Sequence, residues 1–285
     1  MKKITTGLMG LALAMRESLS RSRMARRPEP ASVMDDRESV RCFHDQGADA
    51  LLPVYHFNAL ATARMVRQNG TVLDLGCGSG RYLRHLAAVR PDLRIIGLDL
   101  SRPMLDAGRQ LVLDEGLADR IELRQGDMTD FASAIPERVD LVSSVYSLHH
   151  LPDTAALLKC IEQIRRMRSR DLCGVWIFDH ARPRLACTAE RFPDVVTPDA
   201  PAAFRMDSTN SLKASFSFGS LSRHLDAAGI GTFGHKQSRF FRILQAHWLG
   251  KSGGFVPAAA QELLRPDPER DFRMLRFAFP GLSVK

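Results

Sequence analysis

A glycine-rich turn lies between an apolar run and a helical pattern in the first third of the chain. The apolar run covers residues 71–75, the helical pattern begins at residue 81, and glycine occupies the alternate positions Gly76, Gly78 and Gly80. Glycine lets a backbone approach a ligand closely, and a helix N-terminus offers unpaired N–H groups to an anion. The spacing is G-x-G-x-G and not the G-x-G-x-x-G of dinucleotide sites. The turn therefore predicts a ligand site, without the dinucleotide signature.

Acidic residues end the next two apolar runs. Asp99 closes the second run, where a carboxylate at the carboxyl edge of a parallel sheet can accept hydrogen bonds from a ribose diol. The alternative, that Asp99 caps the following helix, is weaker because Ser101 can serve as that cap. Asp127 and Met128 follow the third run, and a carboxylate with a thioether suits an adenine ring. Alone this pair would be an ordinary turn, but three features at successive strand ends favour a nucleoside site.

Histidine and tyrosine residues follow the fourth and fifth runs. His149 and His150 come after the fourth, and Asp179 and His180 end the fifth. An imidazole there could take a proton from a hydroxyl, amine or thiol. Tyr146 could frame a substrate or offer its ring to a cation. The alternative for the histidines is packing against the neighbouring loop.

Two further residues, Tyr55 and His56, lie on a helical pattern ahead of the glycine turn. We expect them either to frame the substrate or to fill the helix core. The sequence contains no His-x-x-x-His or Cys-x-x-Cys pair, so it predicts no metal site.

The elements that must position these residues alternate between short apolar runs and helical patterns. Such alternation predicts βα units in an open, doubly wound parallel sheet. The expected strands are 71–75, 94–99, 121–125, 139–145 and 173–179, and the expected helices are 48–68, 81–89, 103–115 and 154–168.

The periodicity changes after the fifth strand. Residues 181–216 contain four prolines and little pattern, so we expect an irregular insertion that shapes the substrate pocket. A helix then follows Ser217 as its N-cap. Two late apolar segments, 232–244 and 272–279, are predicted as closing strands, with a second insertion at 245–270 between them.

Taken together, residues 71–152 resemble the class I S-adenosylmethionine-dependent methyltransferases. The resemblance rests on VLDLGCGSG, IIGLDLS, LRQGDM and VDLVSSVYSLHHLPD, in the family's order and spacing. It implies a Rossmann-like, mostly parallel seven-stranded sheet whose last strand is antiparallel. The domain is expected to span residues 36–285, after a basic, flexible or helical extension at 1–35.

The resemblance also implies roles for individual residues. Asp74 and the glycine turn would hold the methionine part of S-adenosylmethionine, Asp99 the ribose, and Leu100, Met104, Asp127 and Met128 the adenine. The full cofactor set expected is Asp74, Gly76, Cys77, Gly78, Gly80, Asp99, Leu100, Met104, Gly126, Asp127, Met128, Ser144 and Val145. The catalytic candidates are His149, His180 and Tyr146, and the substrate candidates are Tyr55, His56, His150 and Asp179.

Composition is consistent with a globular enzyme that acts on small molecules. The chain has 285 residues, of which 45% are apolar and 25% charged, with a net charge of +8. Residues 1–27 hold seven basic residues and one acidic residue, so a charge of +6 lies in the extension. The remainder is nearly neutral, which disfavours nucleic acid as a partner. The extension could be solvated, could touch a membrane as an amphipathic helix, or could close over the active site.

The sequence also indicates a cytoplasmic protein. No apolar run reaches the roughly 18 residues of a membrane span. Residues 4–15 resemble a signal peptide, with a small-residue site at 12–14, but the apolar run is short and arginines follow it, so secretion is disfavoured. Its five cysteines are Cys42, Cys77, Cys160, Cys173 and Cys187; their odd number and wide spacing indicate free thiols in a reducing compartment.

We therefore expect direct in-line methyl transfer to a small-molecule acceptor, with S-adenosylhomocysteine as product and a homodimer as one oligomeric option. Because positioning can supply about 7 to 11 kcal/mol of a barrier, a general base is optional. The alternatives are an RNA methyltransferase, a non-catalytic partner subunit that keeps the cofactor pocket, and a nicotinamide-dependent oxidoreductase.

Overall fold

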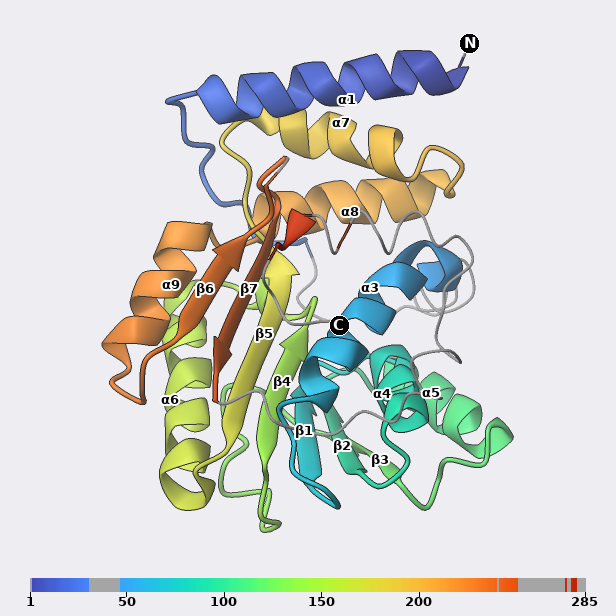
Figure 1. The fold of residues 1–285 in the computed structure, drawn as a ribbon, viewed down its shortest axis with the longest axis vertical. Helices are drawn as coiled ribbons and strands as arrows, with labels where there is room; N and C mark the ends of the chain where they lie inside the picture. The colour runs from blue at the N-terminus through green and yellow to red at the C-terminus, as the bar shows by residue number, and fades with distance from the viewer. Residues whose placement is uncertain (1, 31–46, 240, 251–274, 276–277, 281–285) are drawn as a thin grey trace.

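The computed structural model describes residues 2–30, 47–239, 241–250, 275 and 278–280. Within these residues seven strands form one sheet in the order β3-β2-β1-β4-β5-β7-β6 (Figure 1). The first five strands are parallel, and β7 is antiparallel to both β5 and β6. The strands are β1 (Thr71–Leu75), β2 (Arg94–Asp99), β3 (Ile121–Gln125), β4 (Leu141–Val145), β5 (Gly174–His180), β6 (Gly234–Gln237) and β7 (Leu244–Leu249). The predicted doubly wound sheet is confirmed.

Helices cover both faces of the sheet. One core packs β1 through Val72 against α3 (Gly47–Ala63), α4 (Arg81–Val89) and α5 (Arg102–Asp114). The other packs β1 through Leu73 against α6 (Thr154–Asp171) and α9 (Phe218–Ala227). Successive strand residues alternate between the two cores because side chains point to opposite faces of a strand. Among the described residues, no helix is both long and apolar enough to cross a bilayer.

The closing strands differ from the prediction. β6 and β7 form a hairpin, so the single strand predicted at 232–244 is divided into two. The second strand, β7, starts at the last residue of that range and continues through residues 245–249 of the expected insertion. Gln245 and His247 interrupt the apolar pattern by which a buried strand is recognised in a sequence. Both side chains are nevertheless fully buried, and they are hydrogen-bonded to each other. Residues 251–274 and 276–277 lie outside the described residues. They hold the remainder of that stretch from residue 251 on and five of the eight residues of the strand predicted at 272–279.

The segment 181–216 also differs from the prediction of irregular structure. It forms two helices, α7 (Ala186–Val196) and α8 (Ala202–Ala214). Pro201 is the N-cap of α8, a position that requires no helical N–H bond, and Pro193 lies within α7. Prolines therefore obscured the helical pattern without preventing the helices.

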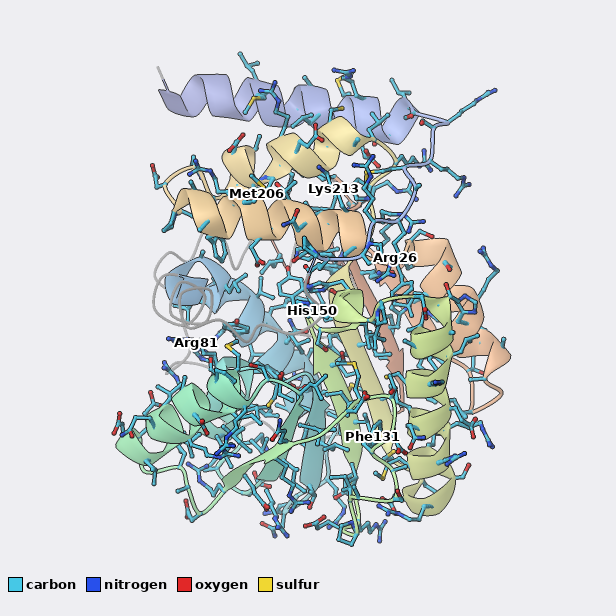
Figure 2. All side chains as sticks on the ribbon, turned by 180° about the vertical axis from the view of Figure 1, so that it is seen from behind. Arg26, Arg81, Phe131, His150, Met206 and Lys213 are labelled. Carbon is cyan, nitrogen blue, oxygen red and sulfur yellow. The ribbon has the colours of Figure 1, made fainter. Side chains whose placement is uncertain are left out.

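The basic extension begins with an ordered helix, α1 (Lys2–Leu19). Figure 1 shows α1, α7 and α8 stacked above the carboxyl ends of the parallel strands, and Figure 2 shows the same stack from behind. The buried carboxylate of Glu17 accepts hydrogen bonds from the backbone N–H groups of Arg184 and Leu185 and from the Thr188 hydroxyl. These groups lie at the N-terminus of α7, where a carboxylate is favoured, so Glu17 fixes α1 on α7.

Candidate active site

The glycine turn has the backbone that its sequence requires. Gly76, Gly78 and Gly80 have φ angles of 70°, 54° and 71°, in the left-handed region that favours glycine. A Cβ atom on Gly76 would lie 2.4 Å from the Cβ of Ser147. Gly80 is the N-cap of α4. The turn therefore makes a cradle that a side chain would fill.

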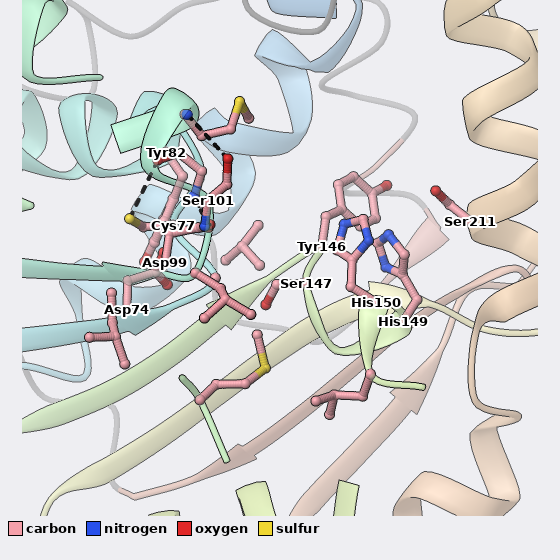
Figure 3. Close-up of a pocket in the computed structure, with 18 of the residues that line it drawn as sticks. Asp74, Cys77, Tyr82, Asp99, Ser101, Tyr146, Ser147, His149, His150 and Ser211 are labelled. Atoms are coloured by element: carbon pink, nitrogen blue, oxygen red, sulfur yellow. Dashed lines mark hydrogen bonds between the residues drawn. The ribbon is translucent and has the colours of Figure 1, made fainter. Parts of the chain in front are cut away.

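A pocket of about 360 Å³ opens at this turn and continues past the ends of β4 and β5. Figure 3 shows its two ends, with Asp74 and Asp99 at one and Tyr146 and His149 at the other. Most of the predicted residues line it: Tyr55, Asp74, Gly76, Cys77, Gly78, Asp99, Leu100, Met104, Gly126, Asp127, Met128, Val145, Tyr146, His149, His150 and His180. The structure thus brings these residues together in one pocket, and their roles toward a ligand stay predictions.

Four predicted residues are not among the lining residues. Ser144 lies behind the wall and is hydrogen-bonded to Ser147, and Asp179 lies behind His149. Gly80 serves as the α4 N-cap, and His56 is buried on α3. The structure therefore does not support direct ligand contact for these four; in particular, His56 belongs to the helix core.

The carboxylates at the cradle end are held by short hydrogen bonds. Asp99 accepts from the backbone N–H of Gly78 at 2.7 Å and of Ser101 at 2.9 Å. Asp74 accepts from the Ser143 hydroxyl at 2.6 Å. Burial raises the pKa of Asp74 to about 7 despite this hydrogen bond, and the charge of Asp99 adds to the rise. Asp99 thus links the ends of β1 and β2 and orients the turn.

Two aromatic rings form the middle of the pocket. Tyr146 stacks on His180 with ring centroids 4.4 Å apart, and its φ of 54° is unusual for a residue other than glycine. Such backbone strain is typical of functional sites. Burial lowers the pKa of His180 to about 4, so this ring is neutral at pH 7. Its buried Nδ1 has no hydrogen-bond partner in the described part of the chain, which leaves it available to a ligand.

His149 forms a buried pair with Asp179. Its Nδ1 lies 2.6 Å from Oδ1 of Asp179, and its backbone N–H donates to Oδ2 at 3.0 Å. Burial lowers the pKa of the imidazole, but the charge and the hydrogen bond of Asp179 outweigh it and raise the pKa to about 9. The carboxylate thereby fixes the ring orientation and directs Nε2 away from Asp179, toward the carboxylate of Glu29.

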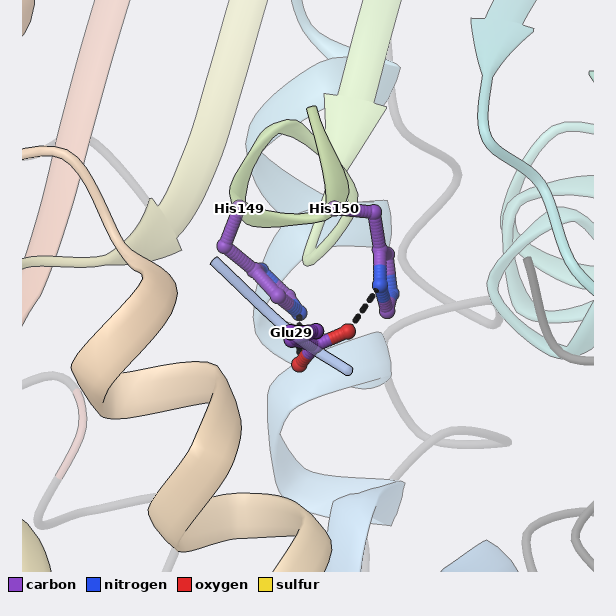
Figure 4. Close-up of side chains that lie close together, drawn as sticks. All are labelled: Glu29, His149 and His150. Atoms are coloured by element: carbon purple, nitrogen blue, oxygen red, sulfur yellow. Dashed lines mark hydrogen bonds and ion pairs between the residues drawn. The ribbon is translucent and has the colours of Figure 1, made fainter. Parts of the chain in front are cut away.

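Glu29, from the segment after α1, reaches this end of the pocket (Figure 4). Its two carboxylate oxygens bond to Nδ1 of His150 at 2.5 Å and to the hydroxyl of Ser211 at 2.8 Å, and Nε2 of His149 lies 3.9 Å away. Burial alone would raise the pKa of Glu29, but His150 lowers it to about 2.

The side chains of Glu29, His149 and His150 could also converge on a metal ion, since one ligand atom from each lies within 4.8 Å of the others. Both Glu29 oxygens already accept hydrogen bonds, however, and the guanidinium of Arg26 donates to the carbonyl oxygen of His149 at 3.0 Å. We therefore interpret the cluster as a wall of the pocket. The absence of a metal stays a prediction.

The sequence did not indicate which individual residues of the segment 181–216 line the pocket. Asp207 and Ser211 on α8 line the pocket, as does Phe204, although the surrounding segment was expected to shape the acceptor site. Arg26 holds the N-terminal segment in place through the carbonyl oxygens of Leu151, Pro152 and Ala214 and lies 4.2 Å over the Phe216 ring. Helical spacing of polar residues on α8 was the only available signal.

Comparison with known proteins supports the resemblance to methyltransferases that the sequence showed. Residues 72–169, about a third of the chain, match the family model described as a methyltransferase domain. The chain is 37% identical over 109 residues to the demethylmenaquinone methyltransferase of Lactiplantibacillus plantarum, covering 37% of this chain and 44% of that protein. It is 32% identical over 101 residues to the ubiquinone biosynthesis O-methyltransferase of Aeromonas salmonicida, covering 35% and 40%. This chain thus spans less than half the length of either relative.

Solved structures share the fold at low sequence identity. A SAM-dependent methyltransferase from Aquifex aeolicus aligns with a TM-score of 0.51 at 16% identity, covering 75% of this chain and 98% of that one. The plantazolicin methyltransferase BamL aligns with a TM-score of 0.52 at 13% identity, covering 84% and 81%. At such identities the likeness shows the fold alone.

Residues 72–169 match a methyltransferase domain, and the sheet order, the glycine cradle and the strand-end carboxylates agree with the class I S-adenosylmethionine-dependent type of this domain. The matched family model agrees with this assignment and confirms the resemblance seen in the sequence. The cofactor of this class is S-adenosylmethionine, and the cradle with Asp99, Met104 and Met128 fits it. The oxidoreductase alternative has no support from these findings.

Proposed function

We propose that the protein transfers a methyl group from S-adenosylmethionine to a hydroxyl group of a small molecule. The observation that carries the proposal is a single pocket with the glycine cradle at one end and the His149–Asp179 pair at the other. When bound, S-adenosylmethionine supplies an electrophilic methyl group on a positively charged sulfur.

The cradle end would hold and orient the cofactor. The backbone of Gly76 and Gly78 lets the methionine part approach, and the N-terminus of α4 favours its carboxylate. Asp99 would accept hydrogen bonds from the ribose hydroxyls, while Met104 and Met128 would pack on the adenine. Tyr146 lines the same pocket, between these residues and His149, and would adjoin the bound cofactor.

The acceptor end would position the hydroxyl and remove its proton. His180 offers its neutral Nδ1 as a hydrogen-bond acceptor, and the unprotonated Nε2 of His149 would take the hydroxyl proton as the oxygen attacks the methyl carbon in line. Asp179 stabilises the resulting imidazolium. Because the pKa of His149 is about 9, the reactive form increases with pH up to that value.

The cover of the acceptor end by α8 supports a small acceptor. Phe204, Asp207 and Ser211 of α8 line this end of the pocket. Behind the lining, Glu29 bonds to Ser211 and Arg26 bonds to the carbonyl oxygen of Pro152. The names of two relatives, ubiquinone biosynthesis O-methyltransferase and trans-aconitate 2-methyltransferase, also denote small acceptors. Location in the cytoplasm and a homodimer remain predictions.

The test combines binding and turnover. Calorimetry should show that S-adenosylhomocysteine binds, and release of S-adenosylhomocysteine from S-adenosylmethionine should be stimulated by phenols or aliphatic alcohols from a panel that also contains amines and carboxylic acids. H149Q should lower the hydroxyl-dependent rate by about 10²- to 10⁴-fold while binding stays unchanged. Stimulation by amines alone, or an H149Q variant with full activity, would contradict the hydroxyl assignment.

A further inference from the structure

Helix α1 carries an apolar stripe on its outer surface. Leu8, Leu11, Met15 and Leu19 are 65%, 60%, 56% and 79% exposed. Their spacing of three, four and four residues puts them on one face of the helix. The stripe is about 16 Å long at 1.5 Å per residue. Large exposed apolar residues that share one face mark an interaction site, whereas single ones are ordinary.

The opposite face of α1 fixes the stripe in this orientation. Leu13 and Glu17 are 6% and 1% exposed, and Glu17 bonds to the start of α7. Figure 1 shows α1 at one end of the molecule with α7 between it and α8. The helix therefore cannot turn its stripe inward without breaking the Glu17 contacts.

The charge beside the stripe is positive. Glu17 is the single acidic residue among residues 1–27, and it faces α7. Arg16 is exposed on α1, and Arg21 and Arg23 are exposed just after the helix ends at Leu19. An apolar stripe flanked by basic residues is the pattern of a helix that lies in a membrane interface. A second copy of the same helix would bring like charges together, so charge complementarity favours an anionic surface.

We propose that α1 docks on an anionic lipid bilayer, with its apolar stripe in the headgroup region and its arginines on lipid phosphates. The order α1, α7, α8 then puts the acceptor end of the pocket on the membrane side of the molecule. The docking claim concerns binding alone and does not depend on the proposed function.

Sedimentation with lipid vesicles tests the proposal. The full chain should sediment with phosphatidylcholine vesicles that contain phosphatidylglycerol and stay in solution with phosphatidylcholine alone. The double variant Leu11→Ser, Met15→Ser should bind at least about tenfold more weakly. Arg21→Gln with Arg23→Gln should weaken binding about 30-fold at low salt. This change equals about 2 kcal/mol at about tenfold per 1.4 kcal/mol, or about 1 kcal/mol for each arginine.

The control is Leu113→Ser, on α5, where the leucine is 62% exposed. It should leave vesicle binding unchanged. Calorimetric binding of S-adenosylhomocysteine and far-ultraviolet circular dichroism, measured on each variant, separate a docking defect from a folding or cofactor defect. Absence of wild-type binding, equal binding to neutral vesicles, or a stripe variant that dissociates a dimer without changing vesicle binding would overturn the proposal.

Discussion

The interaction between Asp179 and His149 predicts a large change in an imidazole pKa on the substitution Asp179→Asn. In the wild type the carboxylate lies 2.6 Å from Nδ1 and raises the pKa of His149 to about 9, against the burial that lowers it. The asparagine keeps the shape but removes the charge. We expect the pKa of His149 to fall below its ordinary value of 6.5.

Two other histidines of the protein indicate how far the pKa of His149 should fall without the Asp179 charge. Burial lowers the pKa of both His56 and His180 to about 4. Glu29 still favours the charged ring in the variant, so His149 should titrate between these limits, from about 4 to 6.5. In the wild type, the rise from 6.5 to about 9 corresponds to about 3 kcal/mol. Because the folded pKa is raised, this stabilisation is present below pH 6.5 and is lost as pH rises through about 9.

Nuclear magnetic resonance of ¹³C-labelled histidine measures this pKa without an acceptor substrate. The nine histidines give separate signals, and the one that disappears in H149Q belongs to His149. The matched control is Asp226→Asn, which removes a carboxylate 3.0 Å from His235 and should leave His149 unchanged. A wild-type midpoint near 6.5, or a midpoint still near 9 in D179N, would refute the reasoning.

Three further substitutions test other parts of the molecule. Asp99→Ala should weaken binding of S-adenosylhomocysteine by about 1 to 3 kcal/mol in calorimetry, and an unchanged Kd would remove Asp99 from the site. Gly76→Ala should destabilise the protein in urea more than Gly116→Ala, because both have positive φ but only Gly76 lacks room for a Cβ; equal losses would contradict this. Arg90→Lys should cost about 3 kcal/mol at neutral pH, since buried Arg90 bonds both oxygens of Asp92. The Arg90 hydrogen bonds lower the pKa of Asp92 to about 2. The stability difference between wild type and Arg90→Lys should therefore shrink as pH falls from 3.8 through about 2. A stability difference that stays constant over this pH range would contradict the argument.

The βα units were predictable because their signals are local. The strand that ends in Asp99 is apolar and short, and the helix after it starts with Ser101 as N-cap, whose hydroxyl accepts from the backbone N–H of Met104. The positive φ angles at Gly76 and Gly78 are the reason for the glycines that identified the turn. Local chemistry therefore determined both the sheet and the cofactor end of the pocket.

The last strand was not predictable from the same kind of signal. β7 reads as polar at Gln245 and His247, and both are buried because partners elsewhere in the fold satisfy them. Gln245 donates to the carbonyl oxygens of His180 and Phe216, and His247 bonds to His235 on β6. Such long-range hydrogen bonds remove the cost of burying polar groups, and a hydrophobic pattern does not contain them.

The acceptor end depends even more on contacts between distant parts of the chain. Glu29 is 121 residues from His150 and 182 from Ser211, yet it bonds to both. Arg26 neighbours it in sequence and bonds to the loop after His149. In the sequence these two residues are ordinary members of a charged, proline-containing segment, and only the docking of α1 on α7 brings them to the pocket. Because Glu29 favours the protonated form of His149, a segment outside the family match contributes to the charge state of the candidate base. The candidate base thus lies inside the matched range 72–169, whereas Asp179, Glu29 and the α8 residues that surround it lie outside that range.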